Sequence, residues 1–382
     1  MTKKKIVHLT YDMRIGGTET VIKNLVEGTD KALFDVEILC IEPELGPFGQ
    51  QLLDKGYNIT NLNWLGGFDR EVIKNIRQFI KKHDIDILHC HQYTPWVYGT
   101  LAATLTKTKV IFTEHGRFYP DSSSWKRKLI NPILVAMTDH ITTISKATKQ
   151  ALVKYEFIPE SKIEVIYNGI EPLVPDIDAV ERLKSDLKIP HDAKILGTVA
   201  RLDPIKNQTM MLRAFAQVLK EYPNTFLVIV GDGEERTNLE NLTDTLDIRN
   251  HVRFVGYIAK PVNHIQLMDI FLLSSLSEGT SMTLLEAMSL GKPFVVTNVG
   301  GNPEVVNEYN NGLVTQNDNC GNFSFAIEQL LLSEGTLNNY GENSRSRFQD
   351  NFCRSKMVYN YFSLKTLKAN KNQYDREGKD VK

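Results

Sequence analysis

Short runs of β-branched and other apolar residues alternate along the chain with amphipathic stretches of helical period. The first half contains six such runs, which we expect to be strands: Ile6–Thr10, Val36–Ile41, Ile85–Cys90, Val110–Thr113, Ile141–Ile144 and Ile163–Ile166. The second half contains six more: Ile195–Ala200, Phe226–Val230, Val252–Val255, Ile270–Ser274, Phe294–Thr297 and Gly312–Val314. Strands that alternate with helices predict parallel sheets covered by helices, which is an α/β fold.

Two prolines and no hydrophobic periodicity mark the segment Glu171–Asp176, which separates the halves. A chain of 382 residues is longer than one hydrophobic core usually organises. We therefore expect two domains, an N-terminal one over residues 1–172 and a C-terminal one over 193–345. Residues 173–192 are interpreted as a linker, and residues 346–382 as closing helices with a polar tail.

Charge and composition exclude several function classes. The 45 basic and 46 acidic side chains give a net charge of −1, which provides no reason to expect a nucleic-acid partner. The longest apolar runs are far shorter than the roughly 20 residues of a membrane-spanning helix. Met1–Lys5 leads directly into an expected strand and not into a signal peptide, so we predict a cytoplasmic protein. Four cysteines without a C-x-x-C pair indicate reduced thiols.

The stretch Ser274–Gly301 carries the most chemical information. A small polar loop is followed by apolar residues at helical spacing, until Gly291 and Pro293 end the helix. The start of a helix presents free backbone N–H groups, which bind phosphate well. Two carboxylates with seven residues between them, Glu278 and Glu286, lie where they could accept hydrogen bonds from sugar hydroxyls. The alternative is that both glutamates are merely solvated.

Four other loops that follow expected strands carry candidate residues. Arg201 and Lys206 could offset negative charge on a departing diphosphate, although a simple surface pair is the alternative. His115 lies just beyond a strand, where open α/β sheets carry their ligands, although lone histidines are usually structural. Gly16-Gly17 and Gly231 allow close backbone approach, and ordinary turns are the alternative. The first of these loops is not G-x-G-x-x-G, which argues against a nicotinamide dehydrogenase.

Nothing in the sequence predicts a metal or an organic cofactor. His89 and His91 share one face of a strand, but two ligands without a nearby third make a poor metal site. The D-x-D patterns at Asp84–Asp86 and Asp176–Asp178 lie before a strand and in the expected linker, so we interpret both as chance.

Together these motifs resemble those of the family 4 glycosyltransferases, the retaining group 1 glycosyl transferases with the GT-B fold. Glu278 and Glu286 match the E-x7-E signature, Arg201 and Lys206 match R-x4-K, and Gly300–Glu304 matches G-G-x-x-E. The motifs occur in the family's order from Gly16 to Glu304, so the resemblance covers nearly the whole chain.

The resemblance implies two Rossmann-like domains that face each other across a cleft, with the nucleotide held by the C-terminal domain and the acceptor by the N-terminal domain. It implies that Glu286 binds the ribose hydroxyls, that Glu278 lies against the donor sugar, and that His115 contacts this sugar. The backbone amides of Ser281, Met282 and Thr283 would hold the distal phosphate or the sugar. Gly16, Gly17 and Gly231 would approach the donor.

The implied activity is metal-independent transfer of a hexose or N-acetylhexosamine from a nucleotide sugar, in which a UDP-sugar is favoured because the family uses it often. The acceptor would be a glycan or a lipid-linked glycan in cell-envelope or exopolysaccharide biosynthesis. Two alternatives stay open at this point. One is a nucleotide-sugar epimerase with the same fold, and the other is a non-catalytic nucleotide-sugar-binding protein.

Aromatic and basic residues follow His115 directly. Phe118 and Tyr119 should border the acceptor side of the cleft, and Trp125 precedes the basic run Lys126–Lys128. Aromatic residues beside cations suit sugar faces, phosphates and anionic lipid surfaces. We therefore expect weak, salt-sensitive contact with the cytoplasmic face of the membrane, and an exposed loop with a solvated helix start is the alternative.

Overall fold

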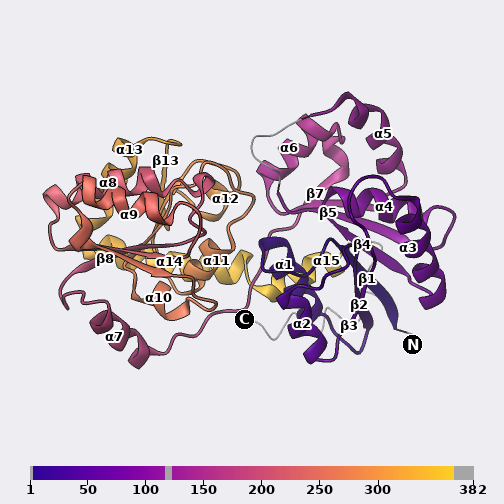
Figure 1. The fold of residues 1–382 in the computed structure, drawn as a ribbon, viewed down its shortest axis with the longest axis horizontal. Coiled ribbons are helices and arrows are strands. Elements are labelled where there is room, and N and C mark those ends of the chain that lie inside the picture. Colours follow the sequence, from indigo (N-terminus) through magenta and orange to yellow (C-terminus); the bar gives the residue numbers. More distant parts are fainter. Residues whose placement is uncertain (1–2, 117–122, 365–382) are drawn as a thin grey trace. The chain divides into compact units, whose positions relative to one another are not determined.

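Two compact units make up the chain in the computed structural model, which describes residues 3–116 and 123–364. Unit 1 contains Met1–Gly169 and the chain from Arg354 onward, whereas unit 2 contains Ile170–Cys353. Figure 1 shows that each unit is an α/β structure in which helices cover a sheet.

Unit 1 is built on a seven-stranded parallel sheet in the order β3-β2-β1-β4-β5-β6-β7. Its strands are β1 (Lys4–Thr10), β2 (Phe34–Cys40), β3 (Asn58–Asn61), β4 (Ile87–His91), β5 (Lys109–Glu114), β6 (His140–Thr143) and β7 (Ile163–Val165). Its helices before the chain leaves the unit are α1 (Gly17–Gly28), α2 (Pro47–Asp54), α3 (Arg70–His83), α4 (Tyr93–Ala103), α5 (Trp125–Ala136), α6 (Lys146–Glu156) and the 3-10 helix η1 (Glu160–Lys162).

The helices of unit 1 form where the sequence supplies an apolar stripe and suitable ends. In α3, Val72, Ile76 and Ile80 recur every four residues and are buried. The side chain of Asp69 accepts a hydrogen bond from Glu71 N at the start of this helix, and Asp84 ends it in the left-handed conformation (φ 53°). These features fix α3 against the sheet.

The last described helix, α15 (Arg354–Phe362), belongs to unit 1 although the sequence places it after unit 2. It packs against α1, as Figure 1 shows. The ring of Phe362 lies 4.4 Å from that of Phe34, and Tyr361 Oη lies 3.3 Å from Thr113 Oγ1. The core of unit 1 is therefore completed by the end of the described chain.

Unit 2 is built on a six-stranded parallel sheet in the order β10-β9-β8-β11-β12-β13. Its strands are β8 (Lys194–Val199), β9 (Thr225–Val230), β10 (Val252–Gly256), β11 (Ile270–Leu273), β12 (Phe294–Thr297) and β13 (Gly312–Thr315). Its helices are α7 (Ile177–Asp186), η2 (Pro204–Lys206), α8 (Gln208–Glu221), α9 (Arg236–Thr245), η3 (Arg249–His251), α10 (Val262–Leu267), α11 (Met282–Ser289), α12 (Asn302–Val305), α13 (Cys320–Leu331) and α14 (Glu334–Asn351).

Both sheets reverse their strand order at one point. In unit 1 the chain moves outward from β1 to β3 and then returns to place β4 beside β1. In unit 2 it moves from β8 to β10 and then returns to place β11 beside β8. Open α/β sheets bind ligands outside the carboxyl ends of their strands at such switch points. The topology thus indicates where each unit would hold a ligand.

The observed elements differ from the sequence expectations in three places. Strand β3 was not expected, because Asn-Ile-Thr-Asn is mostly polar and lies at the sheet edge, where its residues are only partly covered. Residues 173–192, expected to be a linker, contain helix α7, which packs against α10. The chain changes unit at Gly169 and again at Cys353, and not at 172 and 345.

No helix within residues 3–116 and 123–364 has both the length and the apolar character needed to cross a membrane.

Candidate active site

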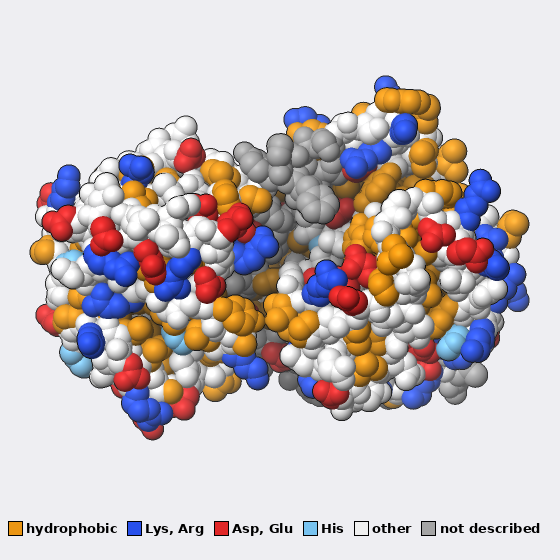
Figure 2. All heavy atoms as spheres, in the orientation of Figure 1, with side chains coloured by type: hydrophobic (Ala, Val, Ile, Leu, Met, Phe, Trp, Pro, Cys, Tyr) orange, Lys and Arg blue, Asp and Glu red, His pale blue; other side chains and the backbone are white. Residues whose placement is uncertain are grey.

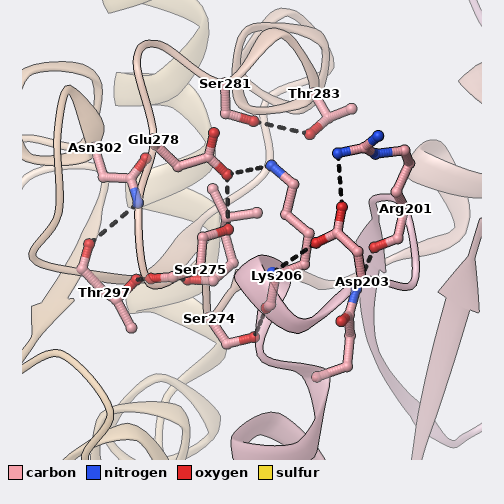
Figure 3. A network of polar contacts seen from close by, with 12 residues as sticks. Arg201, Asp203, Lys206, Ser274, Ser275, Glu278, Ser281, Thr283, Thr297 and Asn302 are labelled. Carbon is pink, nitrogen blue, oxygen red and sulfur yellow. Dashed lines mark hydrogen bonds and ion pairs between the residues drawn. The ribbon is translucent and has the colours of Figure 1, made fainter. Parts of the chain in front are cut away.

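A half-buried ion pair lies at the switch point of unit 2. Lys206 ends η2, which follows β8, and Glu278 lies in the loop after β11. Lys206 Nζ is 2.6 Å from Glu278 Oε1, and the hydroxyl of Ser275 donates to the same oxygen at 2.7 Å. Figure 3 shows this network. Because β8 and β11 are neighbours in the sheet, two residues that are 72 positions apart become direct partners.

Arg201 lies nearby on the chain after β8 and remains accessible. Its Nη2 is 2.7 Å from Asp203 Oδ2, and its side chain is 79% exposed. Asp203 also caps η2, because its Oδ1 accepts a hydrogen bond from Lys206 N at 3.1 Å. In Figure 3 the charged ends of Arg201 and Lys206 point toward the same side of the network as Ser281 and Thr283. Two cations therefore converge beside the start of α11.

The start of α11 has the features of an anion-binding helix end. Ser281 occupies the N-cap position, but its side chain does not cap the helix and instead lies 3.0 Å from the hydroxyl of Thr283. Met282 is the first helical residue. Backbone N–H groups at a helix start attract negative charge through their dipoles. The expected phosphate contacts of residues 281–283 are thus compatible with the local structure.

Glu286 lies within α11, two turns or less from its start, and is half-buried. Burial raises the pKa of its carboxyl to about 7, because the charged form loses hydration there. Near neutral pH this side chain is therefore present both as an acid and as a carboxylate. In the charged form it can accept hydrogen bonds from ligand hydroxyls.

Two glycines allow the backbone loops of this region to approach each other. Gly300 follows β12 with a φ of 50°, and a Cβ atom there would lie 1.6 Å from the carbonyl oxygen of Glu278. Gly231 follows β9 with a φ of 139°, and its Cβ would lie 1.9 Å from the carbonyl oxygen of Ala200. A side chain at either position would displace a loop that carries a charged candidate residue.

In unit 1, Gly16 and Gly17 follow β1 and begin α1, with Gly16 at the N-cap. Gly16 lies against Glu19, whose Oε2 would be 2.3 Å from a Cβ atom at position 16. Burial raises the pKa of Glu19 to about 7, and the charge of Asp12 adds to this effect. Gly16 and Gly17 thus lie after the carboxyl end of β1, the strand that adjoins the switch point.

His115 follows β5 and is the end of a hydrogen-bonded row of histidines. Its Nε2 lies 2.8 Å from Nδ1 of His91, and Nε2 of His91 lies 2.9 Å from Nδ1 of His8. Burial lowers the pKa of His115 to about 3 and that of His8 to about 4, and it holds the pKa of His91 well below the usual range. All three imidazoles are therefore neutral at physiological pH.

Sheet pairing adds a third residue to the two histidines that the sequence placed on one face. Ring atoms of His8, His89 and His91 lie within 4.8 Å of one another, a spacing that a metal ion could exploit. Both ring nitrogens of His91 are, however, hydrogen-bonded to other histidines, and His89 Nε2 lies 2.7 Å from the hydroxyl of Thr113. These bonds account for the cluster without a metal, and the absence of a metal stays a prediction.

The predicted site residues fall into two groups. Unit 2 holds Arg201, Lys206, Gly231, Glu278, Ser281, Met282, Thr283 and Glu286, and unit 1 holds Gly16, Gly17 and His115. Phe118 and Tyr119 lie outside the described residues. The sequence analysis did not single out Asp203, Ser275, His8 or Tyr361. Asp203 and Ser275 lie close to predicted motifs in the sequence, which could have indicated them, whereas only the sheet order reveals His8.

Family models match both units of this chain. The model for glycosyl transferases group 1 matches residues 179–347, and the model for glycosyltransferase family 4 matches residues 15–172. The chain belongs to the family 4 glycosyltransferases. This membership places it among the glycosyltransferases of class EC 2.4, and it agrees with the order of the motifs from Gly16 to Glu304.

Individual relatives of this glycosyltransferase resemble it over nearly the whole chain. UDP-Gal:alpha-D-GlcNAc-diphosphoundecaprenol alpha-1,3-galactosyltransferase of Escherichia coli is 27% identical over 372 residues, covering 94% of this chain and 95% of that protein. A glycosyltransferase structure from Rickettsia africae has a TM-score of 0.85 at 20% identity and covers 97% of this chain and all of that one. The Anabaena protein HepE in complex with UDP has a TM-score of 0.81 at 19% identity, with 94% of this chain and 98% of that chain covered. The fold is therefore GT-B.

Proposed function

We propose that this glycosyltransferase moves a sugar from a UDP-sugar to a glycan or lipid-linked acceptor in cell-envelope or exopolysaccharide biosynthesis, with retention of configuration and without a metal ion. The observation that carries the proposal is the contact of Lys206 with Glu278 beside Arg201, at the switch point of unit 2. Cations next to a helix start are suited to a diphosphate. The UDP complex of HepE and the donor in the name of the Escherichia coli relative support uridine as the nucleoside of the donor.

In this proposal Arg201 and Lys206 stabilise the leaving diphosphate. Negative charge builds on the leaving group as the glycosidic bond breaks, and preorganised cations lower the energy of that state. Glu278 holds the Lys206 ammonium in place through its 2.6 Å contact, and its second oxygen can meet the donor sugar. No side chain of the described site is clearly placed as a nucleophile, so the leaving phosphate would help to deprotonate an acceptor that attacks from the same face.

Product analysis tests the mechanism. We expect that a panel of nucleotide sugars with a lipid-linked glycan acceptor yields transfer from a UDP-sugar, detected by mass spectrometry, and that proton NMR shows the anomeric configuration of the donor in the new linkage. Activity should survive a chelator, because Arg201 and Lys206 supply the positive charge. An inverted anomeric signal, or a loss of activity that added divalent ions restore, would contradict the mechanism.

The same experiment separates the two alternatives. An epimerase would release an altered nucleotide sugar without any acceptor. A non-catalytic binding protein would leave the donor unchanged, and it would have no need of two cations beside the start of α11. Family membership and the retained Arg201, Lys206, Glu278 and Glu286 favour transfer.

We also propose weak, salt-sensitive contact with an anionic membrane surface, and helix α5 supports it. Apolar side chains on this helix are unusually exposed, with Trp125 at 70%, Leu129 at 63% and Ile133 at 63%. These positions are four residues apart, so they share one face of the helix. Lys126 and Lys128 are exposed beside them, and Figure 2 shows hydrophobic and basic side chains together over the region of α5. Such a face is suited to contact with an anionic lipid surface.

One member of the basic run has a different role. Arg127 Nη1 lies 2.8 Å from Oε1 of buried Glu156, and its guanidinium lies 5.2 Å from the centre of the Tyr93 ring. Removing Arg127 would leave a buried carboxylate without this partner. Lys126 and Lys128 are therefore the appropriate residues to change in a test of lipid binding.

Sedimentation with vesicles that contain anionic lipid tests the contact. We expect the parent to bind at low salt and to dissociate at high salt, and a Lys126→Ser, Lys128→Ser variant to bind more weakly. Lys81 and Lys82 on α3 are also exposed and provide a control with the same loss of charge. Equal binding by the α5 variant and the α3 control, or no binding by the parent, would leave a soluble acceptor as the better interpretation.

A further inference from the structure

His8, His91 and His115 form a row, which we call the histidine row, that runs from the interior of unit 1 to the carboxyl end of its sheet. His8 lies in β1, His91 at the end of β4, and His115 just beyond β5. The strands β1, β4 and β5 are neighbours in the sheet, so side chains from three segments meet on one face. Two hydrogen bonds of 2.9 Å and 2.8 Å connect them.

A neutral imidazole carries one N–H and one lone pair, so the two hydrogen bonds of the row cannot be oriented independently. If His91 donates through Nδ1, its Nε2 must accept from His8, and if it donates through Nε2, its Nδ1 must accept from His115. A mixed arrangement would need His91 to carry two protons or none. Burial holds the pKa of His91 well below its usual range, which excludes the doubly protonated form near neutral pH.

The outer end of the row favours one of the two orientations, and the inner end is compatible with it. At the outer end, His115 Nδ1 is buried and has no hydrogen-bond partner in the described part of the chain. A buried N–H without a partner is rarer in proteins than an unused lone pair, so the proton is expected on His115 Nε2. At the inner end, His8 lines a cavity of about 10 Å³ together with Thr29, His89 and Tyr361, which is room for about one water molecule.

We propose that His8 and His91 are positioning residues that hold His115 as its Nε2–H tautomer, so that His115 Nδ1 accepts a hydrogen bond from a hydroxyl group of the substrate. In this arrangement His115 donates to His91, and His91 donates to His8. An unpartnered buried acceptor then becomes satisfied when the ligand binds. The tautomer is independent of the activity, whereas the ligand contact rests on the proposed sugar transfer.

The surroundings of the row contain groups that a test must separate from it. The His89 ring centre lies 4.2 Å from that of His91 and 5.1 Å from that of His8, but its Nε2 pairs with Thr113 and not with the row. Tyr361 of α15 lies 5.2 Å from His89, ring to ring. Glu114 accepts a hydrogen bond from the backbone N–H of His115 at 3.0 Å. His89 is thus a matched control for His8, because it is as buried as His8 and its ring also lies against that of His91.

Long-range proton–nitrogen NMR of the full chain with 15N-labelled histidine tests the tautomer. Single His→Gln variants assign the signals, and the expected parent spectrum shows His91 and His115 as neutral Nε2–H tautomers. His8→Leu removes the acceptor for His91 and should give mixed tautomers at His115, whereas His8→Asn, whose amide can replace Nδ1, and His89→Leu should preserve the parent pattern. A protonated Nδ1 of His115 in the parent, an unchanged tautomer in folded His8→Leu, or the same change in His89→Leu would overturn the proposal. So would a stoichiometric metal in the purified chain.

Donor analogues test the ligand contact. A fluorine atom cannot donate a hydrogen bond. In the parent, deoxy and deoxyfluoro donors at the contacted position should therefore both lower kcat/KM, and this loss should be about tenfold larger than the loss that the same donors cause in His115→Ala. A clearly higher kcat/KM with the fluoro than with the deoxy analogue in the parent would indicate that His115 donates. If the loss of kcat/KM depends on His115 at none of the sugar positions tested, the proposed contact is ruled out. If no donor is turned over, the proposed function fails while the NMR result on the tautomer still stands.

Discussion

The two switch points of this glycosyltransferase carry different chemistry on the same topology. In unit 2 the residues after β8 and β11 are charged and paired, as with Lys206 and Glu278. In unit 1, His91 ends β4 and His115 lies just beyond β5, and burial keeps both imidazoles neutral. A parallel sheet places ligands at its switch point whatever their chemistry, so the side chains there must select the ligand.

The difference has a physical reason within the proposed function. A diphosphate carries formal charge, and charged side chains bind it strongly enough to offset their own loss of hydration. A sugar carries hydroxyl groups, and neutral donors and acceptors bind them without desolvating an ion. Paired charges beside the donor loop of unit 2 and neutral imidazoles in the histidine row of unit 1 therefore predict effects of unequal size when these residues are changed.

The largest effect is expected at the cations of unit 2. Arg201→Ala and Lys206→Gln should each lower kcat by about 100-fold, because a contact to a leaving group is worth about 3 kcal/mol. Gln at position 206 can still hydrogen-bond Glu278, so the fold is preserved while the charge is lost. Steady-state kinetics with the identified donor measure the effect.

Lys194 provides the control for this prediction. It begins β8, at the opposite end of the strand from Arg201, and pairs with Glu334. Lys194→Ala should leave kcat within about twofold, because a surface ion pair contributes little. Near-normal turnover in an Arg201→Ala, Lys206→Gln double variant would remove these residues from the mechanism and would end the contrast between the units.

A smaller effect is expected in unit 1. His115→Ala should lower kcat/KM by about tenfold, which corresponds to one neutral hydrogen bond, and should leave the Kd for UDP unchanged. Calorimetry with UDP and kinetics with the donor separate the two quantities. If His115→Ala weakens UDP binding as much as Glu286→Ala does, His115 contacts the nucleotide and not the sugar.

The smallest effect is the dependence of UDP binding on pH. The pKa of Glu286 is raised to about 7, so the fraction of carboxylate increases between pH 6 and pH 8. If ribose hydroxyls donate to this carboxylate, UDP affinity should rise several-fold over this range, and Glu286→Gln should remove that part of the rise. An identical pH profile in parent and variant would show that Glu286 does not bind the ribose in its charged form.

The free energy of unfolding should change with pH in the opposite direction to UDP affinity. Because the folded-state pKa of Glu286 is above its unfolded value, the stability that it contributes is complete below the unfolded pKa and is lost as the pH rises through about 7. Glu286→Gln should therefore gain stability relative to the parent from pH 5 to pH 8, by at most about 3 kcal/mol. Denaturant unfolding at the two pH values measures this difference.

The sequence analysis named more residues of the charged cluster in unit 2 than of the histidine row in unit 1. Glu278 and Lys206 belong to motifs with fixed spacing, and their type and position relative to the strands indicated the chemistry. Their direct contact could not be predicted, because it depends on β11 lying beside β8. His8 was missed since an isolated histidine in an apolar strand carries no local signal, and only the pairing of β1 with β4 brings it to His91.

Local apolar patterns predicted most strands, but they could not predict the polar edge strand β3 or the unit to which α15 belongs. Twelve strands could be expected from apolar runs, whereas β3 is polar and relies on its neighbour β2 for its conformation. The apolar residues after Cys353 predict a helix, but helical period does not say which core receives it. Packing of Phe362 against Phe34 decides this, and these residues are separated by the whole of unit 2.

The return of α15 to unit 1 affects the order in which a ribosome-bound chain can fold. Synthesis completes every segment of unit 2 before it reaches Arg354. Until α15 emerges, Phe34 lacks its partner Phe362, and Thr113 lacks the nearby hydroxyl of Tyr361. The half of the protein that is made first is thus the half that is finished last, and a nascent chain stalled before residue 354 would expose an incomplete apolar surface of the kind that chaperones bind.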